Sequence, residues 1–174
     1  MSSSRLLLMR HAKSDWDDRS LSDHDRPLNR RGKGDAPRMA RWLHSIDSVP
    51  DVILCSSATR TMQTADLMLP LWENRPKLTV CESLYLSSPE TIFNLIGEAL
   101  QSTSRLLVIA HNPGISSITS HLADQSIQMP TAAVAVFAGQ DAEADQANRW
   151  QYQTWMRPKA LPSLDDTQTD SQSL

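Results

Sequence analysis

Residues 105–114 read RLLVIAHNPG and contain the clearest strand in the sequence. The apolar run from Leu106 to Ala110 is bounded by polar residues and has the length of a strand that is buried on both faces. Asn112-Pro113-Gly114 then opens a helix, in which apolar residues recur at helical spacing: Ile115, Ile118 and Leu122. A buried strand that leads directly into a helix is the repeating unit of α/β proteins.

The same alternation of strand and helix extends from this segment towards both ends of the chain. Strands are predicted at residues 5–10, 51–55, 77–81, 132–138 and 150–156, and further helices at 32–46, 58–69 and 87–100. In the last strand apolar and polar residues alternate, which is typical of a half-buried strand near a sheet edge. The order predicts a single α/β domain with a mostly parallel central sheet and helices on both faces.

Length and composition limit the class of protein. The chain has 174 residues, of which 40% are hydrophobic, and this fits one globular domain. We expect the domain to span residues 5–158, with disordered ends at 1–4 and 159–174, where apolar residues are too few to offset the entropy of ordering. The net charge of −3 creates no positive field for nucleic acid, and no apolar run approaches the roughly 20 residues of a membrane-spanning helix. The first apolar run, Leu6–Met9, is too short for a secretory signal, so we expect a cytoplasmic protein.

The sequence offers no metal or cofactor site. Cys55 and Cys81 are too few for a disulfide framework, and neither has a second cysteine or a histidine at zinc-ligand spacing. Gly32-Lys33-Gly34 matches neither a phosphate-binding loop nor a dinucleotide fingerprint. We therefore expect no cofactor and no metal.

Two histidines and two arginines follow predicted strands. Arg10-His11 ends the first strand, Arg60 comes within five residues of the second, and His111 ends the fourth. Ligands of open α/β sheets bind at the carboxyl ends of the strands, and guanidinium groups with an imidazole nucleophile suit a phosphoryl group. A histidine after a strand can also be an ordinary hydrogen-bonded residue, and Arg60 can be a solvated residue in the first turn of a helix. A cation at that helix end is unfavourable unless an anion lies nearby, which favours a functional role.

Four motifs, in this order along the chain, resemble the histidine phosphatase superfamily, also called phosphoglycerate mutase-like. Residues 9–14 (MRHAKS) resemble its R-H-G or R-H-A signature, residues 25–32 (DRPLNRRG) the block before its first helix, and residues 56–65 (SSATRTMQTA) its S-x-x-x-R-x-x-x-T-A element. His111 stands where that family has its second histidine. The resemblance spans residues 5–138 and is closest to the SixA-type phosphohistidine phosphatases.

This resemblance implies roles for the residues at the strand ends. His11 would be the nucleophile that becomes phosphohistidine, while Arg10, Arg60 and His111 would hold the phosphoryl oxygens. Catalysis would consist of positioning and electrostatic stabilisation of the transferred group. Further candidates for substrate binding are Ser14, Arg26 and Asn112.

One family feature is missing. Mutase-like members carry a glutamate after the third strand as general acid, whereas this chain has Leu84-Tyr85-Leu86-Ser87, so that Leu86 stands at the acid position. Glu82 remains a candidate for that role. An alkoxide leaving group needs an acid, worth about 10²–10⁴-fold in rate, but a phosphorylated imidazole can take a proton from solvent and leave neutral. The missing acid therefore favours phosphohistidine, carried by a protein such as a histidine-containing phosphotransfer domain.

Two other functions remain open. The chain can be a phosphatase for small phosphate esters in which Asp15, Asp18 or Glu82 protonates the leaving group. It can also be a phosphate-sensing or protein-binding module without turnover, although a binder would not need the nucleophile His11. Outside the matching motifs, His24 is interpreted as a solvated loop residue.

Overall fold

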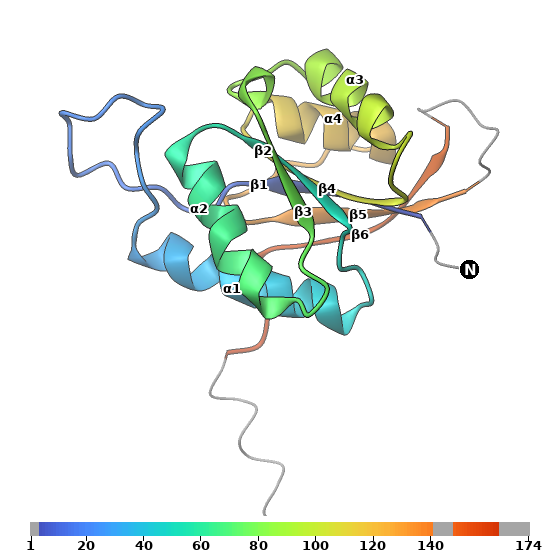
Figure 1. Ribbon diagram of the computed structural model, residues 1–174, viewed down its shortest axis with the longest axis horizontal. Coiled ribbons are helices and arrows are strands. Elements are labelled where there is room, and N and C mark those ends of the chain that lie inside the picture. Colours follow the sequence, from blue (N-terminus) through green and yellow to red (C-terminus); the bar gives the residue numbers. More distant parts are fainter. Residues whose placement is uncertain (1–3, 141–147, 164–174) are drawn as a thin grey trace, which may run out of the picture.

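The computed structural model describes residues 4–140 and 148–163, and in this part of the chain a six-stranded sheet lies between two layers of helices (Figure 1). The strands are β1 (Arg5–Arg10), β2 (Val52–Ser56), β3 (Lys77–Cys81), β4 (Arg105–Ala110), β5 (Val134–Gly139) and β6 (Trp150–Met156). Their order in the sheet is β3-β2-β4-β1-β5-β6. The first four strands of that order are parallel, and β5 and β6 pair antiparallel with their neighbours. The prediction of a mostly parallel α/β sheet with the last strand at an edge is confirmed.

The register of the strands decides which residues meet at the carboxyl edge of the sheet. β1 and β4 are adjacent and parallel, with Arg10 opposite Ala110. His11 and His111, which come next, therefore leave the sheet side by side. On the other side of β4, Cys55 of β2 lies opposite Ile109, so that Ser56 ends at the same edge.

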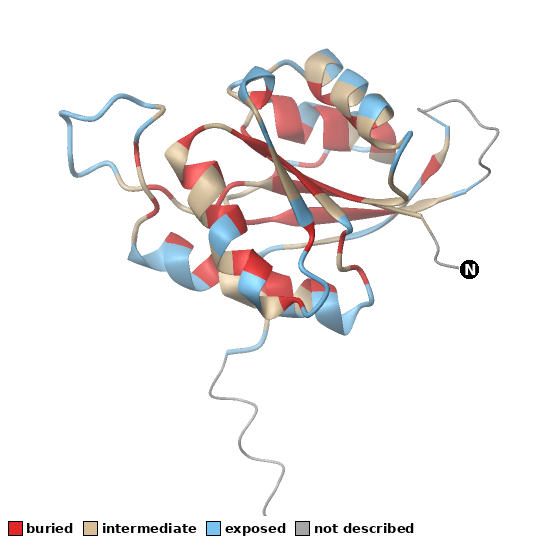
Figure 2. Cartoon of the chain, viewed as in Figure 1, coloured by how far each residue is buried: buried red, intermediate tan, exposed pale blue. Residues whose placement is uncertain are grey.

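Helices cover both faces of this sheet. In the described part of the chain, α1 (Arg30–Ser45) and α2 (Thr59–Met68) cover one face, and α3 (Pro89–Ala99) and α4 (Gly114–Ala123) cover the other (Figure 1). Along β1, Leu7 and Met9 pack in the first layer and Leu6 and Leu8 in the second. Burial on both faces explains why the inner residues of the central strands β1 and β4 are apolar (Figure 2), and it contributes about 1.5–3 kcal/mol for each such side chain. No helix among the described residues is long and apolar enough to cross a membrane.

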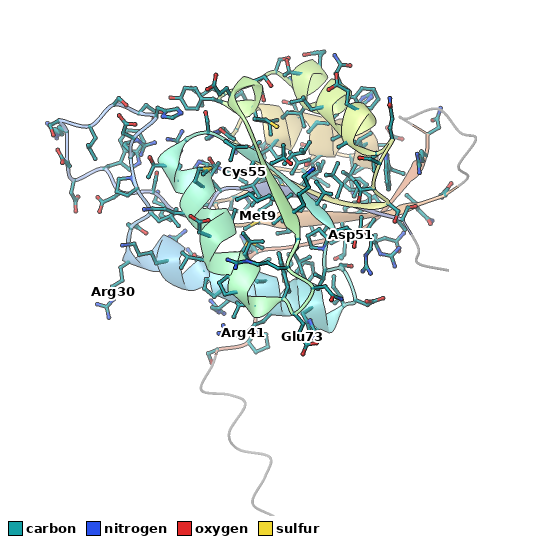
Figure 3. All side chains as sticks on the ribbon, in the orientation of Figure 1. Met9, Arg30, Arg41, Asp51, Cys55 and Glu73 are labelled. Atoms are coloured by element: carbon teal, nitrogen blue, oxygen red, sulfur yellow. The ribbon has the colours of Figure 1, made fainter. Side chains whose placement is uncertain are left out.

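Side chains sort between core and surface as the strand and helix patterns predict. Met9 and Cys55 lie within the core, whereas Arg30, Arg41 and Glu73 lie at the surface (Figure 3). Both cysteines are free thiols. Burial raises the pKa of Cys55 to about 12, so this thiol is an inert core residue.

Local sequence sets where the helices begin. The side chain of Asn29 accepts a hydrogen bond from the backbone N–H of Gly32 at 2.9 Å, and α1 therefore begins two residues before the predicted start. Ser88 caps α3 in the same way, with Pro89 as the first helical residue. In contrast, α2 has no side-chain cap and carries Arg60 in its first turn.

The loop of residues 11–29 joins β1 to α1, and its outer part is exposed (Figures 1 and 2). Near its base a β-bridge pairs Ser14 with Leu28. The base also passes close to α1, because a Cβ atom on Gly32 would lie 2.2 Å from the carbonyl oxygen of Lys13. Only glycine permits this approach between helix and loop.

Residues 159–174 were expected to be disordered, but the first residues of this segment are ordered in the structure. Pro158–Ala160 forms a 3-10 helix, and Leu161 packs against the α1–α2 layer. Arg38 donates hydrogen bonds to the carbonyl oxygens of Leu161 and Pro162 at 3.3 and 3.2 Å. These contacts order a segment that composition alone assigned to a tail. Residues 1–3 and 164–174, also expected to be disordered, lie outside the described residues.

Candidate active site

His11 lies at the end of β1 with its two ring nitrogens in different environments. Nδ1 is 2.7 Å from the carbonyl oxygen of Ala12, and because a carbonyl only accepts, we assign the ring proton to Nδ1. Nε2 then keeps a free electron pair. Burial, together with the nearby His111 and arginines, lowers the pKa of His11 to about 3. The imidazole is therefore neutral near pH 7, which is the state that a nucleophile needs.

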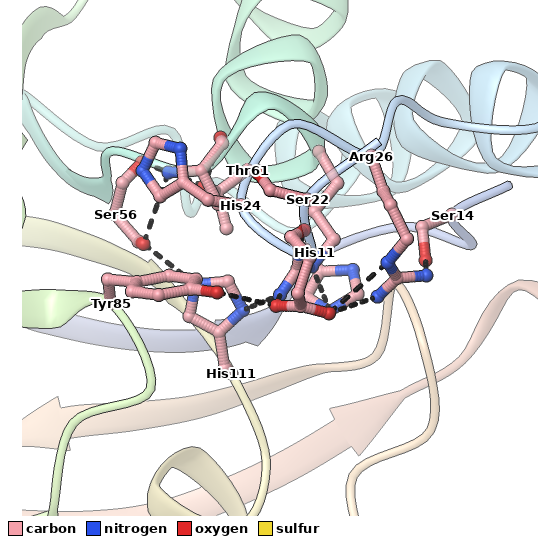
Figure 4. Close-up of polar contacts among 12 residues, drawn as sticks. His11, Ser14, Ser22, His24, Arg26, Ser56, Thr61, Tyr85 and His111 are labelled. Atoms are coloured by element: carbon pink, nitrogen blue, oxygen red, sulfur yellow. Dashed lines mark hydrogen bonds and ion pairs between the residues drawn. The ribbon is translucent and has the colours of Figure 1, made fainter. Parts of the chain in front are cut away.

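His111 is buried beside it, and the two ring centroids are 5.2 Å apart. Its Nδ1 accepts from Nη2 of Arg60 at 3.3 Å, so that Nε2 carries the proton and donates to Oγ of Ser56 at 2.7 Å. Burial, followed by the charge of Arg60, lowers the pKa of His111 to about 3. Arg60, which can only donate, thus fixes the tautomer of the second histidine, and Ser56, which the sequence analysis did not single out, accepts the remaining ring proton (Figure 4).

Arg60 connects the two histidines. Its side chain is only 2% exposed, and Nε donates to Nε2 of His11 at 3.3 Å. The anion that its position at a helix N-terminus requires is supplied by the chain itself: Nη2 lies 3.0 Å from Oδ2 of Asp23, and Nη1 donates to the backbone oxygen of Asp23 at 2.5 Å. Direct hydrogen bonds therefore link His11, Arg60 and His111.

Arg10 precedes His11 and is half-buried. Its Nη1 donates to the carbonyl oxygen of Met129 at 3.2 Å, while its buried Nε has no hydrogen-bond partner among the described residues. Burial, followed by the charge of Arg60, lowers the pKa of Arg10 from its usual value. Asn112 binds the same carbonyl at 3.0 Å and accepts from Ser116 at 2.6 Å, so its amide holds the segment before β5.

Ser14 and Arg26 belong to the loop beside this cluster. Nη1 of Arg26 donates to Oγ of Ser14 at 2.9 Å, and its other nitrogens bind Oδ1 of Asp23. The guanidinium carbon also lies 3.4 Å from the centroid of the Trp16 ring. Arg26 thus contacts Asp23 and the loop, Ser14 contacts Arg26, and in the described part of the chain neither side chain hydrogen-bonds to the histidine pair.

In the described part of the chain, the candidate acids make no hydrogen bond with the histidine pair. Glu82 is exposed and begins a 3-10 helix, and Leu86 is 55% exposed. In the loop, Asp15 and Asp18 accept hydrogen bonds from the backbone N–H groups of Asp17 and Ser20, two residues further on.

Besides Ser56 and Asp23, sequence reasoning missed Tyr85 and His24, which also contact this cluster. The hydroxyl of Tyr85 donates to Oδ2 of Asp23 at 2.6 Å, and the Tyr85 ring packs edge-on against His111 with centroids 5.5 Å apart. His24, interpreted as solvated, is instead half-buried: its Nε2 lies 3.0 Å from Oγ of Ser57, and its ring packs against Tyr85 (Figure 4). Their only sequence signals were their positions, directly before the motif at 25–32 and directly before Leu86.

In residues 4–140 and 148–163 no group of three histidines, cysteines or carboxylates could hold a metal ion. The positive charge of the site comes instead from arginines. A cluster of two neutral imidazoles and two adjacent guanidinium groups can bind and transfer a phosphoryl group.

Comparison with known proteins agrees with this chemistry. The family model of the histidine phosphatase superfamily (branch 1) matches residues 6–84, and the chain belongs to this superfamily. Membership of this superfamily supports a phosphatase. An uncharacterized protein of Mycobacterium tuberculosis is 38% identical over 127 residues, which cover 73% of this chain and 76% of that protein. An uncharacterized chloroplastic protein of Arabidopsis thaliana is 36% identical over 143 residues, covering 77% of this chain and 66% of the relative.

Among solved structures, the chain resembles SixA proteins in particular. The SixA protein of Nakamurella multipartitia, a proposed phosphohistidine phosphatase, has a TM-score of 0.78 and 25% identity, covering 92% of this chain and 99% of that one. The corresponding protein of Agrobacterium tumefaciens has a TM-score of 0.76 and 25% identity, covering 89% and 99%. A protein histidine phosphatase SixA complexed with tungstate, 21% identical with a TM-score of 0.76, shares the fold over 89% of this chain and 97% of its own.

Proposed function

We propose that this protein removes phosphoryl groups from phosphohistidine in a partner protein, such as a histidine-containing phosphotransfer domain. Nε2 of His11 attacks phosphorus while the bond between phosphorus and the substrate imidazole breaks. Arg10, Arg60 and His111 hold the phosphoryl oxygens. Water then attacks phospho-His11, adding its hydroxyl to phosphorus and its proton to the released phosphate.

The observation that carries this proposal is the protonation state of the site. Of the carboxylates in the described residues, Asp23 is the one bonded to this cluster, and its pKa is lowered to about 2. It is ionised near pH 7 and cannot protonate a leaving group. In the second half of the reaction His11 itself departs from phosphorus, and it leaves as a neutral imidazole because Nδ1 already carries a proton. A substrate phosphohistidine, protonated on its other ring nitrogen by solvent, makes the first half chemically equivalent to the second.

The rim of the site supports a protein as the carrier of that phosphohistidine. Trp16 is 65% exposed and packs on Arg26, and Leu86 is 55% exposed and follows Tyr85. Leu86 also has a φ of +47°, a left-handed conformation that costs a non-glycine residue about 1–2 kcal/mol. Large apolar side chains that stay exposed beside a polar site are typical of surfaces that bind proteins. A small phosphate ester would not need them.

Turnover by the parent protein and by His11→Ala tests the proposal. We compare a phosphorylated phosphotransfer protein, a phosphohistidine peptide, and a panel of alkyl and aryl phosphates, with His121→Ala on the exposed side of α4 as the matched control. The phosphoprotein should be hydrolysed fastest, and His11→Ala should lose about 10³-fold, equivalent to about 4 kcal/mol of transition-state stabilisation. Rapid hydrolysis of unactivated alkyl phosphates would replace this proposal with a small-ester phosphatase. Reversible phosphate binding without a phosphoenzyme would indicate a sensing module.

A further inference from the structure

The Asp23 carboxylate receives hydrogen bonds from three side chains that come from separate parts of the chain. Oδ1 accepts from Nε and Nη2 of Arg26 at 3.2 and 2.9 Å, and Oδ2 accepts from Arg60 at 3.0 Å and from Tyr85 at 2.6 Å. Its side chain is 44% exposed. Partial burial raises the pKa of Asp23, but the hydrogen bond from Tyr85 and the charge of Arg60 outweigh burial and lower it to about 2. A loop aspartate with this many donors is held in one place.

Arg60 makes two kinds of contact, on two sides of its guanidinium group. Towards the histidines its hydrogen bonds are 3.3 Å long and end on neutral imidazole nitrogens. Towards Asp23 they are 3.0 and 2.5 Å long, and one of them is assisted by opposite charges. The guanidinium donor is charged in all four bonds, so the bond to the Asp23 carboxylate differs by its charged acceptor, and the bond to the Asp23 backbone oxygen differs by its shorter length. The contacts with Asp23 therefore orient the guanidinium plane, and the longer contacts with the histidines are those that phosphoryl oxygens can replace.

We propose that Asp23 is a positioning residue, which orients Arg60 so that the guanidinium group faces both His11 and His111. This inference rests on the proposed roles of His11 and Arg60 in phosphoryl transfer. The site still attracts phosphate in the presence of the Asp23 carboxylate. Arg10, Arg26 and Arg60 together carry three positive charges, against the one negative charge of Asp23. Tyr85 completes the arrangement by donating to Oδ2, while Arg26 binds Oδ1.

In the alternative role, the Asp23 carboxylate competes with the substrate: it occupies the position on Arg60 that the phosphoryl group would take. A competing carboxylate has to move away when the substrate binds. The Asp23 carboxylate is instead held by Arg26 and Tyr85, independently of Arg60. The two roles predict opposite effects of removing its charge. If Asp23 competes with the substrate, removing its charge should give tighter phosphate binding and faster turnover. If Asp23 positions Arg60, removing its charge should give slower turnover.

The test compares Asp23→Asn with the matched variant Asp25→Asn. Asp25 lies in the same loop and carries the same charge, but its hydrogen bonds go to Ser22 and His24 and not to Arg60. With the phosphohistidine protein as substrate, kcat of Asp23→Asn should fall about 10–100-fold below that of Asp25→Asn, a loss typical of misplaced catalytic groups, while KM changes less than threefold. Both variants should be folded at the assay temperature, although Asp23→Asn should unfold at a lower temperature than the parent because it loses the ion pair with buried Arg60.

A double-mutant cycle with Arg60→Lys shows whether Asp23 acts through Arg60. Lysine has no planar fork to orient, so adding Asp23→Asn to Arg60→Lys should lower kcat less than threefold further. Tyr85→Phe, which leaves the Asp23–Arg60 pair in place, provides a second variant and should lower kcat less than Asp23→Asn does.

Three results would overturn the inference: equal kcat for Asp23→Asn and Asp25→Asn, an undiminished effect of Asp23→Asn in the Arg60→Lys background, or tighter inhibition of Asp23→Asn by orthophosphate with faster turnover. His11→Ala is assayed alongside. If His11→Ala keeps activity, the proposed function fails. If it loses activity while Asp23→Asn does not, only the inference about Asp23 fails.

Discussion

The two buried histidines should make the stability of this protein depend on pH between 5 and 7. Each imidazole has a pKa of about 3 in the folded protein, against about 6.5 in an unfolded chain. As the pH falls below 6.5, protons therefore bind to the unfolded chain before they bind to the folded one, and the folded state loses stability. This stability is fully present above pH 6.5 and is lost progressively towards pH 3.

The magnitude follows from linkage. At pH 5 the unfolded imidazole is mostly protonated and the folded one is not, which lowers the free energy of unfolding by about 2 kcal/mol for each histidine relative to pH 7. The value at pH 5 depends only on a folded pKa well below 5. Asp23, with a pKa lowered to about 2, loses its contribution only below about pH 4, outside this range.

Urea unfolding at pH 7 and at pH 5 measures the effect. The parent should lose about 4 kcal/mol more stability between these pH values than the double variant His11→Gln/His111→Gln, and each single variant should remove about half of that difference. His121→Gln, on the exposed side of α4, controls for the substitution itself. Equal losses in the parent and the double variant would refute the assignment of two neutral, buried imidazoles.

Three further predictions concern the loop and the site. Arg60→Lys should lower kcat/KM for the phosphohistidine protein at least 10²-fold, because an ammonium group cannot reproduce a fork that contacts both histidines and Asp23; a loss below threefold in steady-state assays would place Arg60 outside the reaction. Leu86→Gly should raise the thermal unfolding temperature, since glycine accepts the φ of +47°, and yet raise KM for the protein substrate while leaving aryl phosphates unaffected. Gly32→Ala should lower the free energy of unfolding by more than 1 kcal/mol, because its Cβ would clash with the backbone of Lys13. Gly34→Ala, whose Cβ would have nothing within 4 Å, should instead raise the free energy of unfolding by about 0.5–1 kcal/mol. The reverse order of the two variants in urea unfolding would contradict the packing of the loop against the helix.

The fold and the histidine pair could be predicted because they depend on short-range patterns. Apolar runs such as residues 105–110 define buried strands, and parallel strands bring the residues that follow them to one edge. Asp23 and Tyr85 could not be found in this way, because their contact joins residues 62 positions apart through side chains of irregular segments. No periodicity marks such a pair. The segment at 158–161 was missed for a related reason, since its order depends on Arg38 and the helix layer and not on its own composition.

The place of His11 and His111 after two paired central strands also affects how the protein can lose activity. The backbone N–H of His11 donates to the carbonyl oxygen of Ala110 at 3.1 Å, so the ladder between β1 and β4 reaches His11, the proposed nucleophile. The spacing of the two imidazoles is then tied to hydrogen bonds between two central strands of the sheet. Hydrogen bonds of core strands are typically those that open only in global unfolding. Changes in the surface helices can accumulate without displacing His11, and in a heated sample catalysis should persist until the whole domain melts.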